Sequence, residues 1–182
     1  MIDIQEESIQ GQQLCCPDYK TTRTTVEIIK IYKVTDKYGC LSCIYAHPAT
    51  YNGLTYRTCE ALFQSRRFNG HPEIQDIIRE EKSPMGAKMK AKGNRALLNR
   101  GTKWDEAPED IPLMKECLLL KLEQHPELKQ KLIETGDATI LEDCTSHDRE
   151  SARFWGMVFK DGDWKGENIL GKLWMEIREE IK

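Results

Sequence analysis

The 182-residue sequence lacks the features that would direct it into or across a membrane. It has no apolar run near the roughly 18 residues that a membrane span needs. Its acidic start, Met1-Ile2-Asp3-Ile4-Gln5-Glu6-Glu7, lacks the basic and apolar regions of a signal peptide. The seven cysteines are an odd number and are scattered, which favours reduced thiols over a disulfide framework. We therefore expect a cytoplasmic protein without a membrane partner.

The signature loops of several common enzyme folds are also absent. There is no Gly-x-Gly-x-x-Gly, no phosphate loop ending in Gly-Lys-Ser/Thr, and no Gly-x-Ser-x-Gly. A Rossmann site, a P-loop site and a serine hydrolase are thereby disfavoured. The formal net charge of −3 argues against a broad basic surface for nucleic acid, but it leaves room for contact with one nucleotide.

The cysteines and histidines do not predict a metal site. Four residues could supply zinc ligands by type: Cys40, Cys43, His47 and Cys59. However, a second Cys-x-x-Cys pair is missing and the gaps between these residues are irregular. Cysteine is also a common small buried hydrophobe. We predict no metal and no cofactor.

Hydrophobic patterning predicts an α+β fold, in which a small β-sheet near the N-terminus is followed by a mostly helical region. Residues 26–34 alternate as a strand does, and Asn52-Gly53 predicts a tight turn between two short extended pieces. Capping residues and apolar spacing then predict helices that start near Thr58, Pro72, Pro84, Ile111, Pro126 and Leu170. We expect one domain over residues 26–182, preceded by a polar extension, residues 1–25.

One predicted helical face combines an acid, an amide and a cation. Glu60, Gln64 and Arg67 fall at i, i+4 and i+7, while the apolar residues between them point the other way. Such a face could present a general base beside groups that hold a polar or anionic substrate. Two simpler readings stay open. The face could be a solvated stripe, or Glu60 could serve only to complement the helix dipole.

Four residues elsewhere are further candidates. Asp148 follows a histidine in a polar loop, and Trp155 lies just beyond that loop. Trp155 and Trp104 could each be a core residue or a flat platform for an aromatic ring. Lys121 lies on the apolar side of its predicted helix, where it could snorkel to solvent or be buried and paired in a pocket.

Together these segments resemble the NADAR or YbiA-like family from about Ile31 to the C-terminus. Short segments carry the resemblance in family order: Leu41-Ser42-Cys43-Ile44-Tyr45, Asn52 to Glu60, Gln64 to Phe68, Lys103-Trp104-Asp105, Thr135 to Ala138, Leu141-Glu142, Trp155-Gly156 and Asn168 to Arg178. Their number, order and spacing carry the assignment, and the resemblance implies the YbiA-like fold.

The resemblance also implies an N-glycosidase that acts on ribose-linked amines. Known members cleave early ribosylamino-pyrimidine phosphates of riboflavin synthesis, and others remove ADP-ribose from modified guanine. Glu60 falls on the family's catalytic glutamate, and Trp104, Trp155 and Asn168 fall on positions of its proposed pocket. The substrate is expected to be a small ribosylated nucleobase or ADP-ribosylated nucleic acid, with no obligate protein partner.

Departures from the family pattern favour an altered specificity. Ala61 stands where the family often has histidine, Cys43 where it has asparagine and Arg67 where it has lysine. The last change is not neutral at a tight site. Ala152 stands where an acid is common, and Asp148 could replace that acid through a longer loop.

Breaking a ribosyl C–N bond passes through an oxocarbenium-like state, so the enzyme must stabilise positive charge and deliver water. We expect Glu60 to do both and Asp148 to protonate the departing nitrogen. Trp104 and Trp155 would clamp the base or sugar, and Asn168 would hold ribose hydroxyls. Gln64 is expected beside the substrate. Arg67 and Lys121 are expected there as well, where they would bind phosphate or steer Glu60.

Two other classes of protein fit the same residues. A non-hydrolytic module that binds ADP-ribose or a nucleotide would need the pocket but not the carboxylate. A structural or partner-binding protein would leave the Glu60 face exposed and without a pocket.

Overall fold

The computed structural model describes residues 27–98 and 107–182. The predicted extension, residues 1–25, and Trp104 lie outside the described residues. The helices are α1 (Cys59–Arg66), α2 (Pro72–Glu80), α3 (Pro84–Gly93), α4 (Asp110–Gln124), α5 (Pro126–Ile133), α6 (Glu150–Trp155) and α7 (Ile169–Ile181). The strands are β1 (Ile28–Ile31), β2 (Ala49–Tyr51), β3 (Leu54–Tyr56), β4 (Thr139–Glu142), β5 (Val158–Lys160) and β6 (Asp163–Lys165), and short 3₁₀ turns span Gly39–Leu41, Arg95–Leu98 and Thr145–His147.

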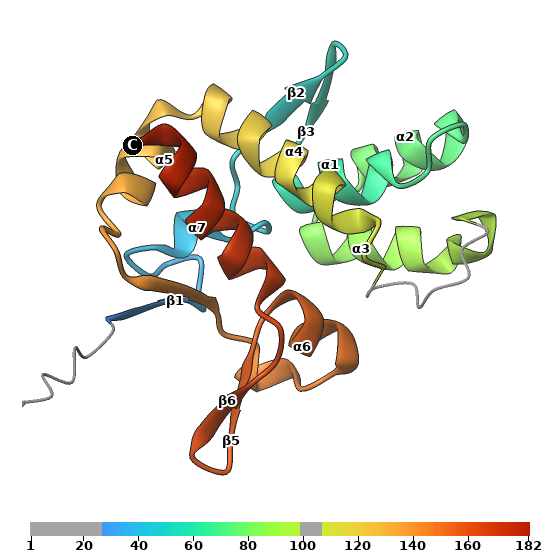
Figure 1. The fold of residues 1–182 in the computed structure, drawn as a ribbon. Helices are drawn as coiled ribbons and strands as arrows, with labels where there is room; N and C mark the ends of the chain where they lie inside the picture. Colours follow the sequence, from blue (N-terminus) through green and yellow to red (C-terminus); the bar gives the residue numbers. More distant parts are fainter. Residues whose placement is uncertain (1–26, 99–106) are drawn as a thin grey trace, which may run out of the picture.

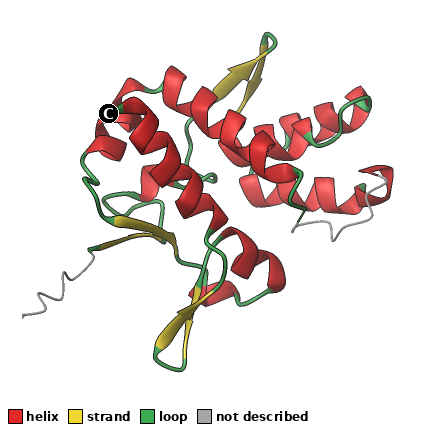
Figure 2. Ribbon diagram, in the orientation of Figure 1, coloured by secondary structure: helices red, strands yellow, loops and turns green. Residues whose placement is uncertain are grey.

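The predicted fold class is confirmed: the chain is a mostly helical α+β domain with small sheets (Figure 2). The strands form three two-stranded pairs: β1 with β4, β2 with β3, and β5 with β6. The β1–β4 pair is parallel, with Ile29 opposite Ile140. The early strand is therefore completed by a strand more than a hundred residues later, which local sequence pattern does not indicate.

The turns of two hairpins each place an Asn-Gly or Asp-Gly pair at positive φ angles. Asn52 and Gly53 have φ angles of 50° and 76°, as the predicted tight turn between β2 and β3 requires. Asp161 and Gly162 have φ angles of 56° and 82° between β5 and β6. The second hairpin was not predicted, although Asp-Gly carries the same signal as Asn-Gly.

The helices begin where capping residues predicted. The Thr58 hydroxyl accepts a hydrogen bond from the Ala61 N–H at 3.2 Å, and the Ser83 hydroxyl accepts one from Gly86 at 2.8 Å. Proline occupies the first turn of α2, α3 and α5. No helix of the described residues is long and apolar enough to span a membrane.

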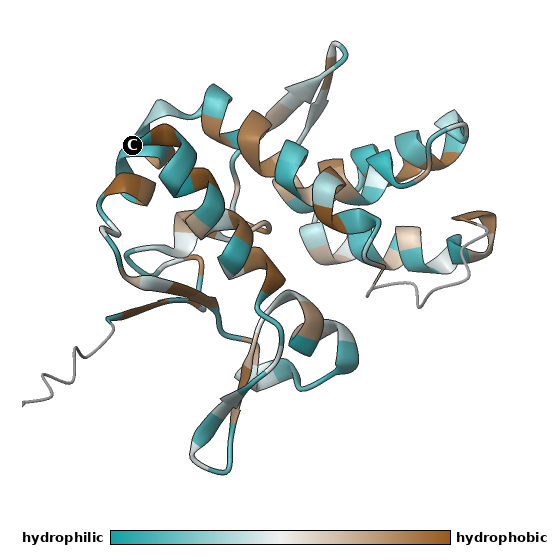
Figure 3. Cartoon of the chain, viewed as in Figure 1, coloured by the Kyte–Doolittle hydropathy of each residue, from teal (hydrophilic) through white to brown (hydrophobic). Residues whose placement is uncertain are grey.

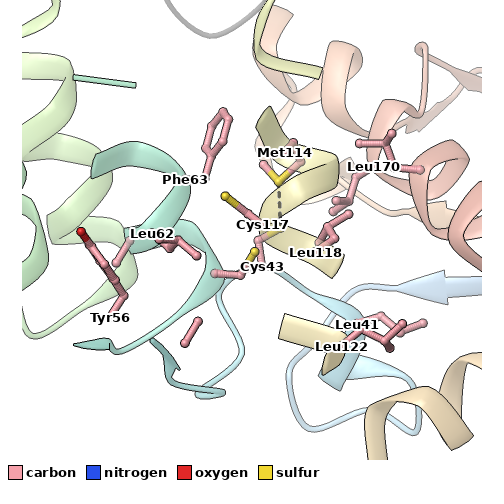
Figure 4. Close-up of a cluster of buried hydrophobic side chains, with 14 of the residues drawn as sticks. Leu41, Cys43, Tyr56, Leu62, Phe63, Met114, Cys117, Leu118, Leu122 and Leu170 are labelled. Atoms are coloured by element: carbon pink, nitrogen blue, oxygen red, sulfur yellow. Dashed lines mark hydrogen bonds between the residues drawn. The ribbon is translucent and has the colours of Figure 1, made fainter. Parts of the chain in front are cut away.

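The core lies between α7, the β1–β4 pair and the α1–α4 pair. In Figure 3 the apolar colour runs along β1 and β4 and recurs along α7. Trp174 of α7 is fully buried, and its indole N–H donates to the Leu41 carbonyl at 2.9 Å. Between α1 and α4, Figure 4 shows Phe63 and Leu62 facing Met114 and Cys117. The described cysteines are all free thiols, as the odd count suggested.

Replacing Trp174 by Phe should therefore destabilise the protein. The smaller ring leaves a cavity and removes the partner of the Leu41 carbonyl, at a combined cost of about 2–3 kcal/mol. The same change at Trp164, which is half-buried on β6, should stay within about 0.5 kcal/mol. Urea unfolding of both variants measures the difference, and equal losses would contradict the packing described here.

Candidate active site

Helix α1, which carries Glu60, is enclosed by protein. Every residue from Cys59 to Ser65 is buried, because α2, α3, α4 and the β2–β3 hairpin pack around the helix. Glu60 is 9% exposed, Gln64 1% and Arg67 6%. The solvated stripe is therefore wrong, and so is the exposed Glu60 face expected of a structural or partner-binding protein. Polar groups this deeply buried require partners inside the protein.

The three polar residues of this face form a continuous chain of hydrogen bonds. The Gln64 amide N–H donates to Glu60 Oε1 at 2.9 Å, and the Gln64 carbonyl accepts from Arg67 Nη1 at 3.0 Å. Arg67 Nη2 then lies 3.0 Å from Asp110 Oδ2, and both side chains are 1% exposed. Arg67 is thus neutralised by a buried carboxylate, which fits steering of Glu60 better than binding of phosphate.

The loop before β2 fixes the backbone of Glu60. The Glu60 N–H donates to the Cys43 carbonyl at 2.9 Å. Lys121 of α4 is fully buried, and its ammonium donates to the carbonyls of Cys40 at 2.7 Å and Ser42 at 2.8 Å. Of the two predictions for Lys121, burial with partners is confirmed and snorkelling is wrong. Its burial lowers the pKa of the ammonium, and it holds in place the loop on which Glu60 rests.

A second carboxyl group lies close enough to Glu60 to interact with it. Glu142 ends β4, and its Oε2 is enclosed by protein without a hydrogen-bond partner among the described residues. The pKa of Glu142 is raised to about 8, mainly by burial and then by the charges of Glu60 and Asp143, while the charge of Lys121 opposes the shift. Glu142 is therefore a protonated acid at neutral pH. In the sequence, Glu142 stands out only as part of Leu141-Glu142, one of the segments that carry the family resemblance. The one local signal was an acid at the end of a buried strand.

Asn168 positions Glu142 from the start of α7. Its side-chain N–H donates to the Ile140 carbonyl at 2.8 Å, and its Oδ1 accepts from the Glu142 N–H at 3.0 Å. The backbone of Asn168 is left-handed, with φ of 53°, a conformation that asparagine tolerates better than most residues. Both polar atoms of the Asn168 amide are thus bonded to the backbone of β4, and its predicted contact with ribose hydroxyls stays a prediction.

Trp155 is brought against α1. It is half-buried on α6, and its ring packs edge-on against Phe63 of α1 at 5.6 Å and against Phe154 at 5.1 Å. The Arg67 guanidinium lies 5.5 Å from the centre of the same Phe63 ring. Trp155 is thus linked by direct packing to the helix that carries Glu60.

Asp148, the predicted second acid, is not brought into this cluster. It is exposed and forms a two-pronged pair with Arg153, at 2.7 and 2.9 Å. That hydrogen bond lowers the pKa of Asp148. A group that must carry a proton at neutral pH needs the opposite shift. The structure therefore favours Glu142 over Asp148 for the role of acid.

Two hollows on the surface lie away from Glu60. One, of about 490 Å³, is lined by α4 and α5 residues together with Ile181. The other, of about 660 Å³, is lined by the loop before β2, by β3 and by the α2–α3 connection. Neither contains a residue of the Glu60–Glu142 cluster. The candidate site is therefore defined by its polar residues and not by either hollow.

Several known proteins are similar to this chain in sequence and in fold. Residues 31–182 match the NADAR domain family. N-glycosidase YbiA of Escherichia coli (strain K12) is 33% identical over 154 residues, covering 85% of this chain and 88% of that protein. N-glycosidase Npun_R5314 of Nostoc punctiforme is 30% identical over 156 residues, covering 85% and 92%. The NMR structure of the E. coli protein YbiA superimposes with a TM-score of 0.65 at 32% identity, covering 85% of this chain and 84% of that one.

The buried ion pair behind Glu60 leads to a stability prediction. Asp110→Asn leaves the Arg67 charge without a buried counter-charge and should cost about 3–5 kcal/mol. Glu116→Gln removes the partner of the neighbouring Arg66, a pair at 2.6 Å in which Glu116 is 61% exposed, and should cost less than about 1 kcal/mol. Urea unfolding compares the two. A similar small loss in both variants would show that the Arg67–Asp110 pair is not buried as described.

Proposed function

The chain belongs to the NADAR family of YbiA-like N-glycosidases, and on that premise we propose that it hydrolyses a ribosyl C–N bond with Glu60 activating the water. The observation that carries this proposal is the buried, hydrogen-bonded Glu60 carboxylate, whose charge helps to raise the pKa of a second carboxyl group, Glu142. Two carboxyl groups with different protonation states are what a glycosidic bond cleavage uses, one as base and one as acid.

Glu60 is suited to the role of base by its support. Gln64 bonds one carboxylate oxygen, and the backbone bond to Cys43 fixes the start of α1. The other carboxylate oxygen is proposed to hold the attacking water at the anomeric carbon. The negative charge also stabilises the oxocarbenium-like transition state. In this scheme Arg67 and Lys121 act through Glu60 and the loop beneath it, without touching the substrate.

Glu142 is proposed to protonate the departing nitrogen, in place of Asp148. Its raised pKa keeps a proton on the carboxyl group at neutral pH, and Asn168 fixes the backbone from which the side chain projects. A pKa of about 8 lies near neutral pH, so the carboxyl group carries its proton there and can still pass it to the departing nitrogen.

The substrate is proposed to be either ADP-ribosylated guanine in nucleic acid or a ribosylamino-pyrimidine phosphate. Both present a flat ring linked through nitrogen to ribose, and the exposed part of Trp155 could stack on that ring. A corresponding role for Trp104 remains a prediction, as does a contact of Asn168 with ribose hydroxyls. A panel assay of both substrate types decides between them. A protein that only binds ADP-ribose would give heat in calorimetry but release no base over hours.

Glu60→Gln should abolish hydrolysis while leaving the fold intact. The amide keeps the shape of the side chain but cannot accept a proton from water, and general-base catalysis is worth about 10²–10⁴-fold in rate. Base release from whichever substrate in the panel is cleaved measures the effect. Glu116→Gln, an exposed site on α4, is the matched control. Undiminished turnover in Glu60→Gln, with unchanged thermal unfolding, would rule out the proposed role.

The pH dependence tests the role of Glu142. If Glu142 is the acid, the rate should fall as the pH rises through about 8, because the carboxyl group loses its proton there. Glu142→Gln should lower the rate and remove this alkaline fall. Asp148→Asn is the matched control, and an alkaline fall that disappears in that variant instead would transfer the role to Asp148.

Stability gives a second measurement on Glu142 that does not depend on activity. The pKa of Glu142 is raised from 4.5 to about 8, so the folded protein retains a proton that the unfolded chain has released. This group therefore contributes less to stability as the pH rises from about 4.5 to about 8. Glu142→Gln should flatten that part of the stability curve. An unchanged curve would show that the pKa is not raised.

A further inference from the structure

The sequence contains the tripeptide His-Pro-Glu twice, each time at the start of a helix. His71-Pro72-Glu73 opens α2, and His125-Pro126-Glu127 opens α5. In both copies the histidine Nδ1 lies close to the glutamate, at 3.6 Å for His71 and 3.4 Å for His125. The two copies are therefore alike in local structure.

The second copy differs because another histidine is stacked on it. The rings of His47 and His125 lie 4.3 Å apart and 17° from parallel. His47 Nε2 lies 3.6 Å from Glu127 Oε1, the oxygen that also faces His125 Nδ1. One nitrogen from each ring and one carboxylate oxygen lie within 4.8 Å of one another. Of the residues that the structure describes, these three form the group that could hold a metal ion, and it contains no cysteine.

One ring nitrogen of His125, Nδ1, faces Glu127, while the other is bonded to the backbone. His125 Nε2 lies 2.7 Å from the Pro48 carbonyl oxygen, which can only accept a hydrogen bond, so Nε2 carries the proton. Nδ1 then has its lone pair directed toward Glu127. A ligating histidine commonly donates its other N–H to a backbone carbonyl in this way.

We propose that His47, His125 and Glu127 form a binding site for a divalent transition metal of the zinc type. Two imidazole nitrogens and one carboxylate oxygen are a common three-ligand set for zinc, with the fourth position left to water. Ligand atoms held about 2.0–2.1 Å from a tetrahedral zinc ion lie about 3.4 Å apart. The two distances to Glu127 Oε1, 3.4 and 3.6 Å, already match that spacing. A small rotation of the stacked rings would complete it.

The site would join two parts of the chain that support Glu60. His47 lies in the loop that also supplies the Cys43 carbonyl to the Glu60 N–H. His125 lies at the end of α4, the helix that carries Lys121, whose ammonium holds the same loop. A bound metal would therefore cross-link the loop and the helix outside the proposed catalytic cluster. This places the metal as a support for the loop and not as a reactant.

Zinc binding to the untagged, chelator-treated full chain tests the proposal. We expect one Zn²⁺ per chain by calorimetry, a higher unfolding temperature with Zn²⁺ than with Mg²⁺, and tetrahedral Co²⁺ bands without a sulfur charge-transfer band. Glu127→Gln and His47→Ala should weaken zinc binding by about tenfold or more, since changes even around metal ligands cost about 10–100-fold. Glu127 is 64% exposed, so that variant should fold normally.

The first His-Pro-Glu copy provides matched controls. Glu73→Gln and His71→Ala make the same changes at a helix start that lacks a stacked histidine, and they should leave zinc binding unchanged. The proposal is overturned if no zinc binds, if Glu127→Gln and His47→Ala bind zinc as the parent does, or if Co²⁺ shows sulfur ligation. None of these outcomes depends on glycosidase activity, so the failure of this site and of the proposed function can be told apart.

Discussion

Burying a charged arginine is unfavourable unless a counter-charge is buried with it, and the Arg67–Asp110 pair meets that condition at the inner end of α1. From this pair, hydrogen bonds run through Gln64 to the Glu60 carboxylate. The orientation of each member depends on the next, because the Gln64 amide can donate in one direction only while it accepts from the other. The placement of Glu60 is thus fixed by a buried charge pair two links away along the chain of hydrogen bonds.

The burial that fixes the Glu60 side chain also raises the pKa of Glu142. A carboxyl group at the end of β4, half-covered and near another carboxylate, keeps its proton at neutral pH. Because its pKa is raised from 4.5 to about 8, Glu142 contributes less to stability as the pH rises through that range. Asn168 and the close approach of Gly171 to the Ile140 carbonyl keep α7 against this strand. The raised pKa of Glu142 therefore lowers the stability of the fold, and the packing of α7 against β4 raises it.

Local sequence predicted much of the fold. Thr58, Ser83 and the first-turn prolines indicated helix starts correctly, because capping depends on residues only a few positions apart. Asn52-Gly53 indicated its hairpin for the same reason, and Asp161-Gly162 would have done so too. The β1–β4 pairing could not be predicted, because the alternation that indicated β1 says nothing of a partner strand more than a hundred residues away.

For the site, the sequence by itself determined the residue types, the spacing of Glu60, Gln64 and Arg67 on one helical face, and the resemblance to the family. Only the tertiary structure decided that this face is buried, that Asp110 neutralises Arg67, and that the charge of Glu60 acts on Glu142 while Asp148 pairs with Arg153. It also decided which His-Pro-Glu copy receives a second histidine. The physical reason is that burial, pairing of charges and shifts in pKa arise from contacts between distant segments, which spacing along the chain does not contain.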